Sequence, residues 1–227
     1  MTFTVLDVPQ RSEAWHTARL GRLTGSRAAD MLATLKGGGE AAGRRNLRVQ
    51  LVLDRLTGVS QENGFVSAAM QAGIDREPEA LAQYEALTGQ LVTPTGFLEA
   101  KGLLAGCSLD GHVGDFEGII EIKCPLAATH LETLKTGLVP GEYLKQITHN
   151  LWVTGAQWCD WLSYHPAFPE PLQSKLVRVV RDEAAILAYD RAARAFLAEV
   201  QTELDAIRTM TALGETLTAS AEPGGTR

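Results

Sequence analysis

The stretch "CSLDGHVGDFEGIIEIKCP", residues 107–125, decides the fold of this sequence. Asp110, Glu121 and Lys123 stand in it among apolar residues that otherwise favour buried β-strands. Burying charged groups is unfavourable unless they pair with one another or bind a metal ion. The three charges therefore raise the question of a functional site in the centre of the chain.

The stretch is predicted to form a β-hairpin that turns at Asp115 and Phe116. In that hairpin Asp110 lies across from Glu121, and Glu121 and Lys123 project from one face because they are two residues apart on a strand. Two converging carboxylates form a hard-oxygen site suited to Mg²⁺ or Mn²⁺. A lysine beside them can position or activate a water molecule, or stabilise developing negative charge. This combination suits the hydrolysis of a phosphodiester.

The alternative is a structural ion pair between the lysine and one of the acids on an exposed strand face, with the other groups solvated. Ile119, Ile120 and Ile122 argue against it, because they indicate a strand that is buried on at least part of both faces. Asp115 and Glu117 belong to the turn and are expected to be solvated loop acids.

The rest of the chain predicts an α/β protein. Apolar periodicity and capping residues predict two short helices in residues 11–35, capped by Ser12 and Ser26. Pro78 must begin a helix or kink one. Further helices are expected at 46–58, 68–89, 141–155 and 182–213, and strands at 91–100, 102–113, 118–125, 157–166 and 175–181. We expect a single domain over residues 1–213, with a mixed central β-sheet flanked by α-helices, and a disordered tail at 214–227.

Composition limits the function classes. The chain has 227 residues, 45% of them hydrophobic, which suffices for one substantial core. No apolar run approaches the ~18 residues of a membrane helix, and the N-terminus lacks a signal-peptide layout, so a cytoplasmic protein is expected. Three cysteines without CxxC or CxH spacing give no indication of structural zinc. The net charge of −6 argues against coating nucleic acid by bulk charge but allows a local basic groove.

A set of motifs resembles a known family. The "SLDG" and "EIK" segments resemble the catalytic core of the PD-(D/E)xK nuclease superfamily. The order of "AWHTARLGRLTGSRAADML", "GIDREPEALAQYEALTG", "LAGCSLDG", "IIEIKCP" and "YLKQITHNLWVTGAQWCDWLSYHP" resembles the YqaJ-type viral recombinase family, which includes phage lambda exonuclease. The resemblance covers roughly residues 15–166 and implies a restriction-endonuclease-like fold.

The resemblance also implies site residues. Asp110 and Glu121 would be the metal-binding carboxylates, with the Ile122 carbonyl as a further ligand. Lys123 would orient or deprotonate the attacking water, and Glu77 would be an acid on a helix that approaches the metal. Further assignments are Gln146 as a supporting glutamine, and Arg19, Ser26 and Ser108 as the pocket for the 5′-phosphate of DNA.

Physical chemistry is compatible with that phosphate pocket. Arg19 offers a forked, permanently charged donor, and a helix that begins at Ser26 would present free N–H groups to an anion. The alternatives are a helix C-terminal charge for Arg19 and a simple cap for Ser26. Trp15 could stack near a DNA end. Where the family commonly has a second glutamine, this chain has Thr148, and we expect the neighbouring His149 to be packed or solvent-facing.

The resemblance implies a Mg²⁺-dependent 5′→3′ exodeoxyribonuclease, with Mn²⁺ able to substitute, that digests linear double-stranded DNA and leaves 3′ single-stranded overhangs for recombination. It also implies a homotrimeric ring around DNA and a partner protein that anneals single strands. Two alternatives stay open, a structure- or sequence-specific endonuclease on the same core and a non-catalytic DNA-end-binding protein. Basic residues beside the glycine loop are candidate DNA backbone contacts or a solvated basic face: Lys36, Arg44, Arg45 and Arg48.

Overall fold

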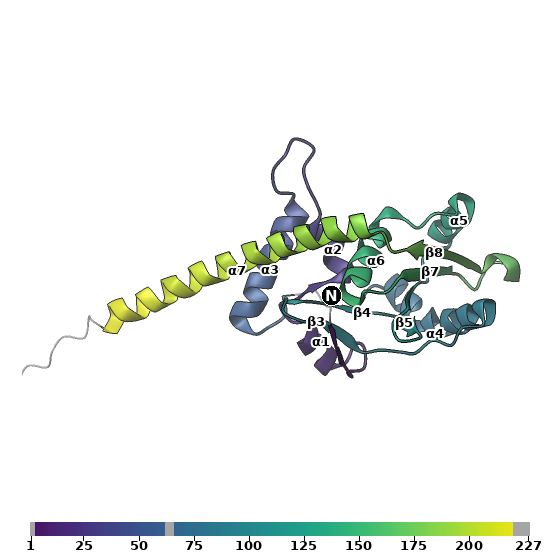
Figure 1. The fold of residues 1–227 in the computed structure, drawn as a ribbon, viewed down its shortest axis with the longest axis horizontal. Helices are drawn as coiled ribbons and strands as arrows, with labels where there is room; N and C mark the ends of the chain where they lie inside the picture. The colour runs from purple at the N-terminus through teal and green to yellow at the C-terminus, as the bar shows by residue number, and fades with distance from the viewer. Residues whose placement is uncertain (1–2, 62–65, 220–227) are drawn as a thin grey trace, which may run out of the picture.

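The computed structural model describes residues 3–61 and 66–219, and within them the strands form two mixed four-stranded sheets (Figure 1). The first sheet has the order β1-β3-β4-β2 and the second β5-β6-β7-β8. The strands are β1 (Phe3–Leu6), β2 (Leu23–Thr24), β3 (Phe97–Ala100), β4 (Ala105–Ser108), β5 (Gly111–Val113), β6 (Gly118–Lys123), β7 (Trp158–Tyr164) and β8 (Ser174–Val180). The predicted α/β class is confirmed, and its strands are divided between two sheets.

The predicted central hairpin is confirmed. Strands β5 and β6 pair antiparallel with Gly111 opposite Ile120, so the same register, extended by one residue, places Asp110 opposite Glu121. Phe116 in the turn has a left-handed φ of 58°. The expected strand at 102–113 is different, because it is broken between β4 and β5, and each part joins its own sheet. Asp110 lies in this break, between the two sheets.

Seven α-helices and two short 3₁₀ segments accompany the sheets in the described part of the chain. They are α1 (Glu13–Arg19), η1 (Gly25–Arg27), α2 (Ala28–Met31), α3 (Ala42–Thr57), α4 (Ala68–Thr88), α5 (Ala127–Thr136), α6 (Gly141–Thr154), η2 (Glu170–Leu172) and α7 (Glu183–Ala219). Ser12 caps α1 as predicted, since its side chain accepts a hydrogen bond from the Trp15 N–H. Helix α4 ends at Gly89, whose φ of 68° is accessible to glycine at little cost.

One local prediction is wrong, and a second is narrowed to one of its alternatives. Ser26 does not cap a helix, because it lies inside η1, and the residue before η1, Thr24, makes no side-chain capping bond. Pro78, expected to begin a helix or to kink one, lies within α4, so the first of these alternatives is excluded. A proline there removes one N–H from the helical ladder, and the tertiary packing of α4 on the second sheet stabilises the helix across it.

The second sheet is covered on both faces, which explains the nearly continuous apolar sequence of β6. Ile119 belongs to the larger core cluster, together with side chains of α6 and α7. Ile120 and Ile122 belong to a second cluster that includes Ala80 and Tyr84 of α4. Alternate residues of β6 therefore face α6 on one side and α4 on the other.

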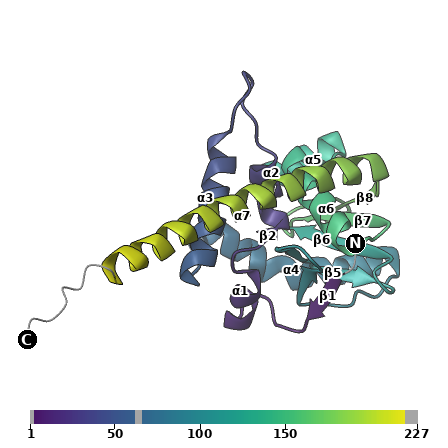
Figure 2. The same ribbon diagram turned by 60° about the vertical axis from the view of Figure 1, so that its left-hand side comes forward.

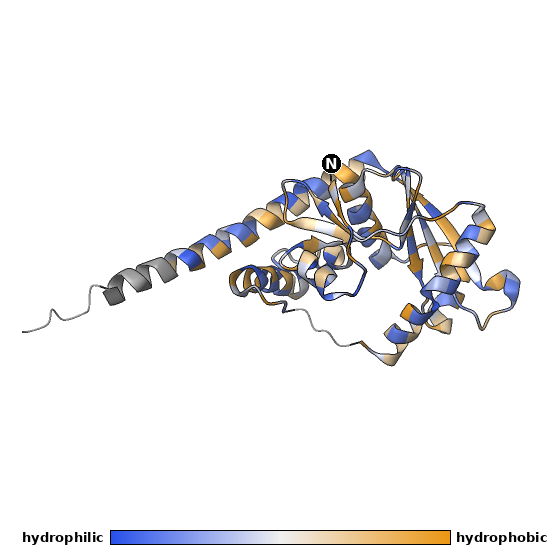
Figure 3. Cartoon of the chain, turned by 90° about the horizontal axis from the view of Figure 1, so that it is seen from below, coloured by the Kyte–Doolittle hydropathy of each residue, from blue (hydrophilic) through white to orange (hydrophobic). Residues whose placement is uncertain are grey.

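Helix α7 leaves the domain as a long extension. It starts beside β8, crosses α3 and projects beyond every other labelled element (Figures 1 and 2). Hydrophilic and hydrophobic residues alternate along it where it lies against the domain, and its apolar face includes Ile186, Phe196, Val200 and Leu204 of the core (Figure 3). The helix continues to Ala219, past the expected domain end at Leu213, and residues 220–227 of the expected tail lie outside the described residues. In the described part of the chain, no helix is both long enough and apolar enough to cross a membrane.

Candidate active site

The site is organised around Glu121, a charged residue at a buried strand position. Its exposed fraction is 2%, because β6 is covered by α6 on this face. Three donors reach its carboxylate: Lys123 Nζ at 2.5 Å and Gln146 Nε2 at 2.6 Å from Oε1, and Asn150 Nδ2 at 3.1 Å from Oε2. Gln146 and Asn150 are one turn apart on α6 and so lie on the same face of that helix. Gln146 thus lies beside the acids, where the sequence motif put it.

Asp110 approaches from the break between the two sheets. Its Oδ2 accepts a hydrogen bond of 2.6 Å from the backbone N–H of Ile122, which fixes the carboxylate beside β6. Burial and then the negative charge of Glu121 raise the pKa of Asp110 from 3.8 to about 6, although Lys123 opposes the shift. The raised pKa shows that burial, together with the nearby charge of Glu121, disfavours the ionised form of Asp110 in the absence of a metal ion.

Lys123 lies at the open end of the same strand face, and its side chain is 27% exposed. Burial acts to lower its pKa, but Glu121 and Asp110 outweigh burial and raise the pKa above the usual lysine range. The ammonium group is also 5.4 Å from the ring centroid of Tyr143 on α6. Lys123 is therefore held as a cation by its bond to Glu121 and by the nearby charge of Asp110. Because Glu121 is buried, this pair differs from the alternative of an ion pair on an exposed strand face.

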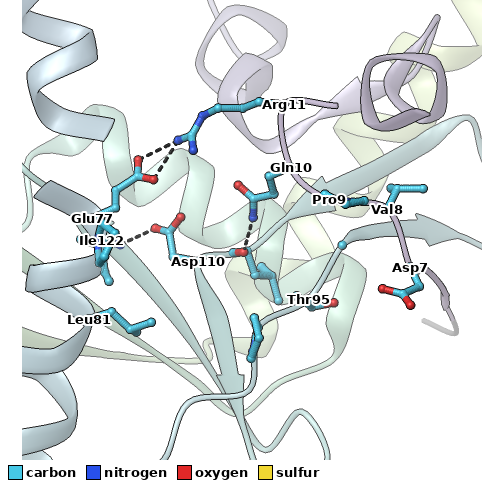
Figure 4. A pocket seen from close by; sticks show the side chains of 14 residues that line it. Asp7, Val8, Pro9, Gln10, Arg11, Glu77, Leu81, Thr95, Asp110 and Ile122 are labelled. Atoms are coloured by element: carbon cyan, nitrogen blue, oxygen red, sulfur yellow. Dashed lines mark hydrogen bonds and ion pairs between the residues drawn. The ribbon is translucent and has the colours of Figure 1, made fainter. Parts of the chain in front are cut away.

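Two open cavities meet at these residues. The first, which we call the N-terminal cavity, has a volume of about 450 Å³ and is lined by the 7–11 segment, Glu77, Asp110 and Ile122 (Figure 4). The second, the helical cavity, has a volume of about 560 Å³ and is lined by α4, α6, Lys123 and Gln146. Glu77 and Ile122 line both cavities. The predicted catalytic residues therefore gather where the two cavities adjoin, with Glu121 buried behind Lys123.

Glu77 projects from α4 toward this junction. Its two carboxylate oxygens are 2.9 and 2.8 Å from Nη2 of Arg11 (Figure 4). Burial raises the pKa of Glu77, and the hydrogen bond from Arg11 opposes that increase. Sequence reasoning singled out Glu77, which lines both cavities, but missed the arginine that pairs with it.

The donor chemistry fits a divalent cation with oxygen ligands. Asp110 and Glu121 offer carboxylate oxygens, and a bound cation would stabilise the ionised form of Asp110, which burial and the charge of Glu121 disfavour. Across residues 3–61 and 66–219, no cluster of three or more His, Cys, Asp or Glu side chains is arranged to hold a metal ion. Backbone carbonyl groups and water would therefore have to complete the coordination, as Mg²⁺ usually allows.

Of the residues expected to bind a 5′-phosphate, Arg19 and Ser108 are linked through Trp15. The indole N–H of Trp15 donates a hydrogen bond of 2.8 Å to Ser108 Oγ, and the Arg19 guanidinium lies 4.3 Å from the Trp15 ring centroid. Trp15 thus joins Arg19 to Ser108. Ser26 is exposed in η1. The adjacent Gly25 lies so close to α6 that a Cβ there would be 2.4 Å from Asn150 Oδ1 and 3.4 Å from Gln146 Cγ.

Other expected residues have structural contacts. His149 is fully buried and bonds the Tyr189 hydroxyl at 2.7 Å and the Gly106 carbonyl at 2.9 Å. Burial lowers its pKa to about 4, so it is a neutral histidine. Of the two expected settings, packed or solvent-facing, the structure shows the packed one. Thr148 donates to the Leu144 carbonyl within α6. Of the basic residues beside the glycine loop, Arg44 and Arg48 form ion pairs with Glu40, Glu199 and Glu203.

Sequence reasoning missed Asn150, Arg11 and Tyr143. Asn150 had a usable signal, because it follows Gln146 by one helical turn and so shares its face. Tyr143 had a weaker signal of the same kind, since it precedes Gln146 by three residues. Arg11 had none, because its backbone adopts a left-handed φ of 67°, which is unusual for arginine.

The fold and the site together define the class of this protein: an α/β nuclease with a D…ExK motif, whose aspartate lies between the two sheets and whose glutamate and lysine lie on β6 of the second sheet. The sequence profile of the YqaJ-like viral recombinase domain matches residues 14–157. The chain belongs to the YqaJ-like viral recombinase domain family. Among curated protein sequences there is no significant match.

Solved structures agree with this assignment. The chain is similar to an alkaline exonuclease, LHK-Exo, from Laribacter hongkongensis, with 40% identity, a TM-score of 0.81, and coverage of 88% of this chain and 98% of that one. The same values hold for LHK-Exo in complex with dAMP. A phage-related exonuclease from Haemophilus somnus 129PT shares the fold, with 13% identity, a TM-score of 0.65, and coverage of 82% and 96%. The chain is thus a homologue of an exonuclease.

Proposed function

We propose that this protein is a Mg²⁺-dependent exodeoxyribonuclease that digests linear double-stranded DNA from 5′ ends and leaves 3′ single-stranded overhangs. The observation that carries the proposal is the meeting of Asp110, Glu121 and Lys123 at the junction of two open cavities. The 40% identical homologue is an alkaline exonuclease, and a structure of it contains dAMP, a unit of DNA. Both findings on the homologue support a DNA substrate for this chain.

Each residue has a chemical role in this proposal. Asp110, Glu121 and the Ile122 carbonyl would hold Mg²⁺, with Glu77 as a further acid that approaches it from α4, and the ion would supply an activated water and neutralise phosphate charge. Gln146 and Asn150 keep the Glu121 carboxylate in one orientation through bonds of 2.6 and 3.1 Å. Lys123 is a cation 2.5 Å from Glu121, and in the proposed reaction its ammonium group orients the attacking water and stabilises developing negative charge.

Digestion in one direction requires a group that recognises one kind of DNA end, since the acids at the proposed site do not distinguish a 5′ end from a 3′ end. Arg19, Ser26 and Ser108 are proposed to bind the terminal 5′-phosphate. Arg19 supplies permanent charge, and its contact with Trp15 positions it relative to Ser108, two residues before Asp110. A terminal phosphate carries more negative charge than an internal one, so such a pocket favours it.

Several features of the proposal rest on family resemblance alone. They are the role in recombination, the assembly into a homotrimer, the partnership with a single-strand annealing protein, and the replacement of Mg²⁺ by Mn²⁺. Each stays a prediction.

The test uses linear duplexes with a 5′-phosphate or a 5′-hydroxyl, labelled separately at each end, beside a closed circular control. We expect Mg²⁺-dependent loss of the 5′ label first and no cutting of the circle. The phosphorylated duplex should be digested much faster. Arg19→Ala should erase most of that preference, a change of about 30- to 150-fold for a charge-assisted contact of about 2–3 kcal/mol.

Three results would count against the proposal. Cutting of the circle would indicate an endonuclease, and DNA binding without Mg²⁺-dependent hydrolysis would indicate an end-binding protein. Equal rates on both linear duplexes would refute the assignment of the phosphate pocket.

A further inference from the structure

The N-terminal cavity contains an arginine that the proposed reaction does not yet use. Arg11 lines this cavity with Glu77 and Asp110, and its side chain is 46% exposed (Figure 4). Among the described residues, its hydrogen bonds to Glu77 use Nη2 alone, so Nε and Nη1 keep their donors. Guanidinium groups with free forked donors are well suited to phosphate oxygens.

The backbone around Arg11 is held in an unusual conformation. Its φ of 67° lies in the left-handed region, which costs a non-glycine residue on the order of 1 kcal/mol or more. The neighbouring Gln10 fixes this segment, because its Nε2 donates a 2.7 Å hydrogen bond to the Leu109 carbonyl, next to Asp110. The arginine is therefore held in a fixed position relative to the acid of the proposed metal site.

The lining of the N-terminal cavity carries more negative than positive charge. Within the described part of the chain, its charged lining residues are Asp7, Glu77, Asp110 and Arg11, so three acids face one cation. A DNA strand that brings phosphates into this cavity meets net repulsion unless cations compensate it. Lys123 lines the helical cavity and is engaged with Glu121. Arg11 is therefore the protein cation available to phosphate on this side of the site.

We propose that Arg11 is a substrate-binding residue whose guanidinium contacts a backbone phosphate of the DNA strand in the N-terminal cavity while it stays paired with Glu77. This inference rests on the proposed DNA substrate. It adds a contact to the strand beside the catalytic acids, separate from the terminal 5′-phosphate pocket at Arg19. The pairing with Glu77 also lets DNA binding influence where that acid points.

The test measures the affinity of the full-length protein for a 5′-phosphorylated linear duplex in EDTA, where no metal contributes, over a series of KCl concentrations. Arg11→Gln removes the charge but can still donate to Glu77, Arg11→Lys keeps the charge, and Arg194→Gln is the matched control. Arg194 is an exposed arginine of α7 that pairs with Asp190.

We expect Arg11→Gln to weaken binding on the order of tenfold at low salt and to reduce the slope of log K against log salt by about one. Arg11→Lys should keep the wild-type slope, and Arg194→Gln should match the wild type. Wild-type affinity and slope in Arg11→Gln would overturn the inference. A lysine variant as weak as the glutamine variant would do the same, since it would indicate a purely structural arginine.

A second measurement avoids any folding defect of the variants. Phenylglyoxal modification of Arg11 in the wild-type protein, followed by peptide mass mapping, should be suppressed by DNA. Unchanged modification in the presence of bound DNA would contradict the contact. Failure of the wild-type protein to bind DNA at all would refute the proposed function, whereas binding that ignores Arg11 would refute this inference alone.

Discussion

Lys123→Ala should slow hydrolysis by orders of magnitude, and it should also change how Mg²⁺ affects stability. In the metal-free protein, Lys123 is the cation that compensates Glu121, which is 2% exposed, and Asp110 beside it. Removing one partner of a buried ion pair typically costs about 3–5 kcal/mol. Glu121 keeps Gln146 and Asn150 as donors, and the lysine is 27% exposed, so we expect a smaller loss, about 2–3 kcal/mol.

Mg²⁺ should recover part of this loss, because a bound divalent cation supplies the missing positive charge. We expect Mg²⁺ to stabilise Lys123→Ala by about 1–2 kcal/mol more than it stabilises the wild type, which corresponds to roughly 2–8 °C in Tm for a chain of this size. The assay is thermal unfolding at pH 8 in EDTA and in saturating Mg²⁺, where the raised pKa of Asp110 still leaves it ionised.

Lys135→Ala serves as the control, since Lys135 is an exposed lysine in the last turn of α5. It should match the wild type in both buffers and in turnover. The reasoning is refuted if Mg²⁺ stabilises the wild type as much as Lys123→Ala or more. Near-normal turnover of Lys123→Ala would separately remove Lys123 from the catalytic residues.

Two further predictions follow from distances and pKa shifts. Gly25→Ala should lower stability by about 1–3 kcal/mol and slow hydrolysis, because its Cβ would lie 2.4 Å from Asn150 Oδ1 and displace a donor to Glu121. Urea unfolding measures the stability and a turnover assay measures the hydrolysis, and wild-type values in both would contradict the prediction. Since the folded pKa of Asp110 is raised to about 6, its contribution to metal-free stability is present below about pH 4 and is lost as pH rises through about 6. The free energy of unfolding of the wild type minus that of Asp110→Asn should therefore decline by about 2–3 kcal/mol in EDTA as the pH rises from about 4 to about 6. A difference that does not change with pH would refute the raised pKa.

The centre of the site could be predicted because it depends on local geometry. A hairpin turn at Asp115 and Phe116 fixes by simple register which residues meet, and that register alone is enough to bring Asp110, Glu121 and Lys123 together. The helical spacing in α6 has the same local character, and it would have identified Asn150 from Gln146.

The remaining features depend on long-range packing. The division into two sheets follows from which partners β4 and β5 find, β3 and β2 for one and β6 for the other, and sequence periodicity gives no information on that choice. The pairing of Arg11 with Glu77 joins residues 66 positions apart through a left-handed backbone. Ser26 fails as a cap because β2 extends to Thr24, and its parallel pairing with β4 precedes the 3₁₀ turn.

The break between β4 and β5 has a consequence for how the chain tolerates insertions and deletions. Leu109 and Asp110 join a strand of one sheet to a strand of the other, and the Asp110 side chain is anchored on the Ile122 N–H. Adding or removing one residue here would move the side chains of β5 to the opposite face of the sheet, because side chains alternate between the two faces along a strand. Homologous chains should therefore vary in length in surface loops while keeping this two-residue link at constant length, so the spacing is as tightly constrained as the acid itself.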